Sequence, residues 1–219
     1  MVQEETVAVV TETVEEISFV RTQGPESRLF VTSGPPADQE ILKRVNVAAA
    51  HSVIVCTPDD TQNLVAALNV RALAPNVRIV VSVSRPELKD TLKTAGVTYV
   101  ASPADMGGRL CADAAFRPEI ANAVEDLTES DTDADMTEYL LSDRTPISTQ
   151  TLREAEEIVR RATDCLVIGY ARPDEKGEFH TFLNPPSTFR FRPGDAIILI
   201  GSLPNLKRLR QWMGVQQGR

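Results

Sequence analysis

Cysteine is scarce in this sequence of 219 residues, and its three copies lie far apart, at Cys56, Cys111 and Cys165. Their spacing excludes a Cys-x-x-Cys metal clip, and their odd number does not suit a disulfide framework. Cys56 and Cys165 adjoin apolar runs, where a free thiol behaves as a small hydrophobic group. We therefore expect all three to be buried thiols of a cytosolic protein.

Long apolar runs and an excess of basic residues are also absent. No run approaches the roughly 20 apolar residues of a membrane span, and residues 1–5 carry acids where a signal peptide carries bases. Asp and Glu number 31 against 23 Lys and Arg, a formal net charge of -8 at pH 7. Because binding to a phosphate backbone needs clustered Lys and Arg, we expect no nucleic-acid partner.

The first half of the chain contains short runs rich in β-branched residues, each typical of a strand that is buried on both faces. These runs are 7–10, 29–31, 53–55, 77–83 and 99–100. Between the later runs, apolar residues repeat at helical spacing over 64–72 and 88–95. Strands that alternate with helices predict an α/β fold with a parallel, doubly wound sheet.

A longer helical pattern, about 105–127, leaves this sheet and contains Pro118, which should break or kink it. The acidic run 125–135 follows, and its polar and small residues are typical of a linker. We place a domain boundary near Asp133. The acidic stretch 125–138 could collect divalent ions, but its carboxylates are not arranged as a binding loop, so we interpret it as a flexible, solvated hinge.

The second half has the pattern of a small α+β domain. Thr151 and Glu154 have capping-box spacing at the start of a predicted helix, 152–162. Predicted strands follow at 165–171, 178–183 and 196–200, joined by turns rich in Pro, Gly and Asp. Apolar residues over 203–213 then suit a short closing helix.

Four segments in this order resemble the regulator of potassium conductance family, also known by its TrkA-type domains. They are Ser33–Val55, Thr57–Leu64, Leu92–Val100 and Pro193–Gly201. No single segment is specific, since a Pro-Gly-Asp turn before a strand occurs in many proteins; the ordered series carries the resemblance.

The resemblance implies a Rossmann-like regulatory domain, residues 1–132, and a TrkA C-terminal-like α+β domain, residues 133–219. It also implies a homo-oligomer, a dimer or higher ring paired through the crossover helix. The ring would lie in the cytoplasm at the inner face of the membrane and gate an embedded potassium channel or transporter. The alternatives are a ligand-free structural ring module with a degenerate pocket, or a nucleotide-dependent oxidoreductase. We expect no enzyme, because no nucleophile elbow or phosphate loop is present.

One departure from the family concerns the first strand. A complete domain begins with a strand, a Gly-x-Gly-x-x-Gly turn and a helix, whereas residues 1–30 contain only Gly24. The chain therefore aligns from the second strand, so the predicted sheet is incomplete. The missing unit could lie upstream, lie in another chain, or be lost.

Candidate ligand-binding residues follow the strands, where open α/β sheets bind ligands. They are Glu12, Thr57, Asp59, Asp60, Asn63, Ser84 and Arg85. Glu12 could accept ribose hydroxyls, or it could be a solvated acid at a helix start. Asp59, Asp60 and Asn63 could contact a ligand or cap the following helix. Arg85 could pair with a phosphate or with a neighbouring acid.

The ligand itself stays open: the resemblance suggests an adenine nucleotide or a divalent cation. Ser33-Gly34 stands where the family has Gly-Asp, which removes a carboxylate from the nucleotide pocket. Cys56, Ser82 and Ser84 stand where calcium-gated relatives place carboxylates. Hard cations prefer several oxygen ligands, often anionic, so we expect no calcium site of that kind and no metal ligands.

Overall fold

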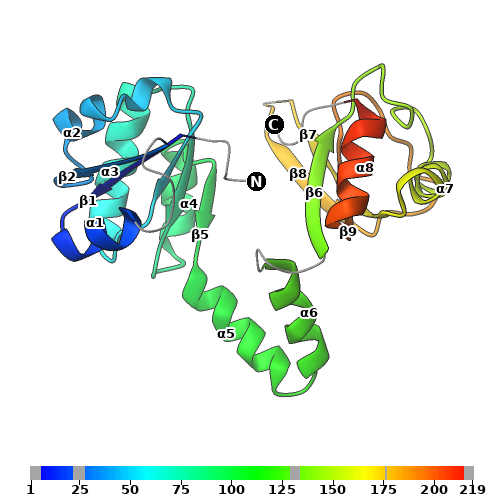
Figure 1. Ribbon diagram of the computed structural model, residues 1–219, viewed down its shortest axis with the longest axis horizontal. Coiled ribbons are helices and arrows are strands. Elements are labelled where there is room, and N and C mark those ends of the chain that lie inside the picture. Colours follow the sequence, from blue (N-terminus) through cyan, green and yellow to red (C-terminus); the bar gives the residue numbers. More distant parts are fainter. Residues whose placement is uncertain (1–5, 22–27, 129–133, 176, 215–219) are drawn as a thin grey trace. The chain divides into compact units, whose positions relative to one another are not determined.

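The computed structural model describes residues 6–21, 28–128, 134–175 and 177–214. The chain divides into two compact units, residues 1–112 and residues 113–219 (Figure 1). The boundary expected near Asp133 falls outside the described residues, so the division into domains at that position stays a prediction.

The first unit alternates strands with helices, as predicted. Its strands are β1 (Val7–Thr11), β2 (Leu29–Ser33), β3 (Ser52–Val55), β4 (Arg78–Ser82) and β5 (Tyr99–Ala101). Its helices are α1 (Val14–Arg21), α2 (Gln39–Arg44), α3 (Asp60–Leu73) and α4 (Leu88–Thr94), with a 3-10 turn, η2 (Val47–Ala49). Asp38 caps α2 and Asp59 caps α3, each accepting two backbone N–H groups that the helix itself leaves unpaired.

The strands of the first unit form two parallel sheets. One is β1–β2 and the other is β3–β4–β5. A complete doubly wound sheet has the order 3-2-1-4-5-6, and the two observed sheets match its two sides without the first strand. The predicted class, an incomplete Rossmann-like parallel sheet, is thus confirmed, and the interruption falls where the absent strand would lie.

The core of the first unit lies between α3, α4 and one face of the three-stranded sheet. Ile79 and Val81 of β4 and Leu92 of α4 are fully buried, as is Val70 of α3. Gly96 ends α4 with a φ of 85°, a left-handed conformation that glycine adopts without strain. This tight turn returns the chain at once to β5.

The stretch expected as one crossover helix is two helices. They are α5 (Pro103–Ala114) and α6 (Pro118–Thr128), separated before Pro118 as predicted, because proline cannot continue the preceding hydrogen-bond ladder. No residue of α5 is buried. No helix in the described part of the chain has the length and apolar composition to cross a bilayer.

The second unit is built on an antiparallel sheet of order β6-β9-β7-β8. Its strands are β6 (Ala134–Leu140), β7 (Leu166–Pro173), β8 (Phe179–Leu183) and β9 (Ala196–Ser202). Its later helices are α7 (Leu152–Thr163) and α8 (Leu203–Met213), which lie on one side of the sheet (Figure 1). The core between them includes Tyr139, Val159, Ile197 and Leu209.

Local signals in the second unit act as predicted. Thr151 and Glu154 form the capping box of α7: the Thr151 hydroxyl accepts the Glu154 N–H, and the Glu154 carboxylate accepts the Thr151 N–H. Trp212 of α8 is partly buried and packs against the same core.

Two expectations are wrong. The stretch 125–138 is not a continuous hinge: α6 runs to Thr128 and β6 begins at Ala134, and only residues 129–133 lie outside the described part. β6 forms because it pairs along its whole length with the apolar β9. Cys56 and Cys111 are exposed, and only Cys165 is buried. Cys56 follows the end of β3, beyond the residues that face the core, and Cys111 lies on α5, which buries none of its residues.

Candidate functional site

The seven candidate residues lie at the carboxyl ends of three parallel strands. Glu12 follows β1; Thr57, Asp59, Asp60 and Asn63 lie between β3 and the first turn of α3; Ser84 and Arg85 follow β4. Hydrogen bonds join them in two groups: Thr57, Asp59 and Asn63, with Glu12 linked through Gln62, and Asp60 with Ser84 and Arg85. We call these two groups together the polar network of the strand ends. Whether this network binds a ligand stays a prediction.

Asn63 lies at the centre of this network and is fully buried. Its Oδ1 accepts the Thr57 N–H at 2.9 Å and the Thr57 hydroxyl at 2.7 Å. Its Nδ2 donates to the carbonyls of Thr57 at 2.8 Å and Ser82 at 3.0 Å. Both amide atoms are saturated with protein partners, so this side chain fixes the ends of β3 and β4 against α3.

Asp60 ties α3 to the segment after β4. Its carboxylate accepts the Ser84 N–H at 2.8 Å and the Arg85 N–H at 3.0 Å, and Arg85 Nε donates to it at 3.2 Å. The pKa of Asp60 is held below its ordinary value, first by the Ser84 N–H and then by Arg85, while burial opposes the shift. Of the two alternatives for Arg85, the described contact is with a neighbouring acid.

Asp59 and Glu12 are more open. Asp59 is the N-cap of α3 and accepts the Thr61 and Gln62 N–H groups through one oxygen, Oδ1. Glu12 is exposed and accepts a hydrogen bond from Gln62 Nε2 at 3.2 Å. Gln62 was not among the candidates. Its position in the first turn of α3, beside the predicted capping residues, could have indicated that it lies at the strand ends.

The polar network contains few side chains that remain accessible to a ligand. Glu12, Asp59 and the partly exposed Arg85 guanidinium are the accessible charges. A carboxylate pair with one guanidinium could hold ribose hydroxyls and a phosphate. Among the described residues, no group of three or more His, Cys, Asp or Glu is placed to hold a metal ion.

In the second unit, the turn Pro193–Asp195 holds a buried ion pair. Asp195 is fully buried and accepts two hydrogen bonds of 2.6 Å from Arg172 of β7, through Nε and Nη2, and one of 3.0 Å from the Arg192 N–H. The pKa of Arg172 is raised, chiefly by these hydrogen bonds to Asp195. The ion pair with Arg172 therefore fixes the turn that the Pro-Gly-Asp motif predicts. The sequence did not indicate Arg172, because its partner Asp195 lies 23 residues farther along the chain.

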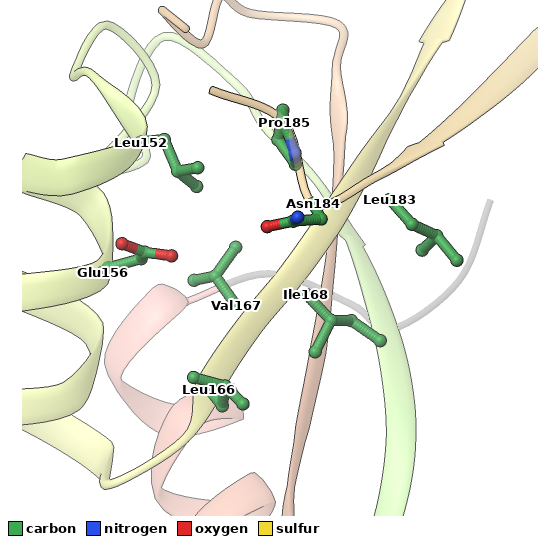
Figure 2. Close-up of a pocket in the computed structure, with 8 residues that line it drawn as sticks. All are labelled: Leu152, Glu156, Leu166, Val167, Ile168, Leu183, Asn184 and Pro185. Atoms are coloured by element: carbon green, nitrogen blue, oxygen red, sulfur yellow. The ribbon is translucent and has the colours of Figure 1, made fainter. Parts of the chain in front are cut away.

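The second unit also has a cavity of about 410 Å³ between α7 and the strands β7 and β8. Its lining is mostly apolar, with Glu156 and Asn184 directed toward one another across it (Figure 2). None of the seven candidate residues lines it. Sequence patterns gave no signal for it, because its walls come from segments far apart in the chain.

Comparison with known proteins identifies relatives. The TrkA-N domain model matches residues 1–103. The chain is 27% identical over 190 residues to the probable potassium channel protein 2 of Methanocaldococcus jannaschii, covering 84% of this chain and 53% of that protein. It is 23% identical over 188 residues to potassium channel protein 1 of the same organism, covering 86% and 54%.

The chain thus spans about half the length of the curated relatives it matches. Among solved structures, the human SLO3 gating ring is similar with a TM-score of 0.70 at 16% identity, covering 95% of this chain and 42% of that one. At this identity the likeness shows a shared fold. It extends over both units.

Proposed function

We propose that this chain belongs to the regulator of potassium conductance family and is the cytoplasmic regulatory module of a potassium channel or transporter. The observation that carries the proposal is the extent of the similarity: two potassium channel proteins match 84% and 86% of the chain, more than the Rossmann-like unit alone. A domain shared only for its fold would match the first unit and not the second.

The proposed module acts by assembly. In the second unit, Ile120 and Val124 lie four residues apart on α6 and are 47% and 42% exposed, and Phe116, in the turn before α6, is 88% exposed. Helical residues four apart share one face, and side chains of this size are usually covered. We propose that this α6 face, together with Phe116 in the preceding turn, pairs with a second copy of the chain, forming the dimer from which a ring is built.

Ligand binding would bias one arrangement of the assembled copies over another, and the difference in affinity would supply the work of gating. We propose an adenine nucleotide or a divalent cation, held near Glu12, Asp59 and Arg85. The second candidate function is a ring module that binds no ligand. It is supported by the saturation of Asn63 and Asp60, whose hydrogen bonds are already made within the protein.

Assembly is tested by sedimentation of the 219-residue chain over a range of concentrations. We expect a dimer or larger oligomer, and Phe116→Asp should weaken it at least tenfold, because a charge replaces an apolar group worth about 2 kcal/mol on burial. Leu203→Asp, at a residue that is 44% exposed on another helix of the same unit, is the matched control. A chain that stays monomeric at every concentration would refute the proposed assembly.

Ligand sensing is tested by thermal unfolding with ATP, ADP, Mg²⁺ or Ca²⁺. A ligand present at 100 times its Kd stabilises the folded state by about 2.7 kcal/mol. Glu12→Gln should reduce the stabilisation by a nucleotide. Absence of any shift with all four would favour the ligand-free module.

A further inference from the structure

The cavity of the second unit contains a carboxylate without a counter-ion. Glu156 lies on α7, is half-buried, and makes no hydrogen bond or ion pair with another described residue. Arg160, one turn farther along α7, pairs with Asp164 instead. The adjacent Glu157, by contrast, accepts a hydrogen bond of 2.7 Å from Arg161. A carboxylate against an apolar wall is costly unless a cation compensates for its lost hydration, so Glu156 favours a cationic ligand.

Asn184 faces this carboxylate from the opposite wall of the cavity. It follows β8 and has a φ of 49°, a left-handed conformation that asparagine adopts more readily than most residues. Its backbone N–H donates to the Ile168 carbonyl at 3.0 Å, which fixes the position of the residue. Figure 2 shows its amide oxygen on the side toward the Glu156 carboxylate. Two hydrogen-bond acceptors therefore face one another, and a group that binds both must be a donor.

The rest of the lining is apolar. Its side chains are Leu152, Leu166, Val167, Ile168, Leu183 and Pro185. Leu152 and Val167 are buried, whereas Leu166 and Leu183 are 44% and 67% exposed. The volume of about 410 Å³ lies within the range of roughly 300–1,000 Å³ that is usual for small-molecule sites. An apolar group that covers these side chains would remove their surface from water, which favours binding.

The chemistry of the lining distinguishes between classes of ligand. A divalent metal ion needs several oxygen ligands, and this cavity offers one carboxylate and one amide oxygen among apolar side chains. A phosphate or carboxylate ligand would be repelled by Glu156. An alkylammonium group is charged at neutral pH, like the lysine side chain, and has three N–H donors.

From these observations we infer that the cavity binds a primary amine with an apolar body. The ammonium group lies between Glu156 and Asn184 and donates to both, and the apolar body packs against the leucine, isoleucine and valine side chains of the lining. The site lies wholly within the second unit and uses none of the seven candidate residues at the strand ends. Its failure would therefore leave the proposed role in potassium transport unchanged.

The test compares three probes of similar shape by titration calorimetry with the 219-residue chain. They are phenethylamine, its neutral analogue phenethyl alcohol, and phenethyltrimethylammonium, which keeps the charge and has no N–H donor. We expect phenethylamine to bind at least tenfold more tightly than either of the others, because only its ammonium group makes charge-assisted hydrogen bonds. Failure of phenethylamine to bind, or equal binding of the alcohol or of the trimethylammonium compound, would overturn the inference.

Two substitutions assign the binding to this cavity. Glu156→Gln should weaken phenethylamine binding at least tenfold, whereas Glu157→Gln, the matched control at the next residue of α7, should leave it unchanged. Asn184→Gly should weaken binding without lowering the thermal stability of the chain, because glycine adopts the left-handed conformation without strain. Unchanged binding in Glu156→Gln would overturn the inference. An equal loss in Glu157→Gln would overturn it too, since the amine would then be attracted only by the acidic surface.

Discussion

Asn63 offers the sharpest test of how the strand ends are held. Asn63→Ala removes four hydrogen bonds and leaves three backbone groups without partners: the Thr57 N–H, the Thr57 carbonyl and the Ser82 carbonyl. Each of these three backbone groups costs about 1 kcal/mol when water can partly replace its lost partner, as at the half-buried Thr57 and Ser82, and the Thr57 hydroxyl keeps its hydrogen bond to the Asp59 carbonyl. We therefore expect a loss of about 3 kcal/mol in the unfolding free energy of the first unit.

The assay is native-state hydrogen exchange of the segments around β3, α3 and β4, supported by urea unfolding followed by circular dichroism. At a typical urea dependence of about 2 kcal/mol per molar, the midpoint should fall by roughly 1.5 M. Asn69→Ala is the matched control: the same residue type on the same helix, half-buried, with two hydrogen bonds. If both variants lose the same stability, the central role given to Asn63 is refuted.

Three further predictions concern charge and reactivity. Arg172→Ala should lower the free energy of unfolding, measured in denaturant, by about 3 kcal/mol, because it leaves the buried Asp195 carboxylate without its bidentate partner. If Arg172→Lys keeps more than half of the stability that Arg172→Ala loses, the bidentate contact is not what stabilises the turn. The lowered pKa of Asp60 contributes stability that is complete above about pH 5 and is lost as the pH falls through the folded pKa. The difference in unfolding free energy between the unmodified chain and Asp60→Asn should therefore shrink between pH 5 and pH 3. A difference that stays constant over this range would contradict the prediction. When the folded chain is labelled with a thiol reagent, the exposed Cys56 and Cys111 should react quickly. Cys165 should react slowly, because it is buried and burial raises its pKa. Three equal rates would show that Cys165 is accessible.

Most of the fold could be predicted because its signals are local. The β-branched runs became strands, and the break before Pro118 follows from a missing N–H and a fixed φ. The capping box at Thr151 likewise depends on residues three apart. The absence of the glycine turn predicted an incomplete sheet, and the sheet is interrupted at the corresponding place.

What could not be predicted depends on residues distant in sequence. β6 reads as part of an acidic linker, and it becomes a strand because β9, 56 residues or more beyond it, supplies a full set of partners. The exposure of Cys56 depends on where β3 ends relative to the core. At the candidate site the sequence could name Asn63 and Asp60, both in α3. Their hydrogen-bond partners Ser82, Ser84 and Arg85 lie at and after the end of β4, 19 to 25 residues farther along the chain.

The most direct test of the central claim is potassium flux through a chimeric channel. The matched region of the Methanocaldococcus jannaschii probable potassium channel protein 2 is replaced by residues 1–219, and flux into liposomes is compared with that of the channel from which the region is deleted. We expect the chimera to alter flux, and Phe116→Asp in the chimera to abolish the difference. A chimera that assembles in the membrane but conducts like the deleted channel would contradict a regulatory role.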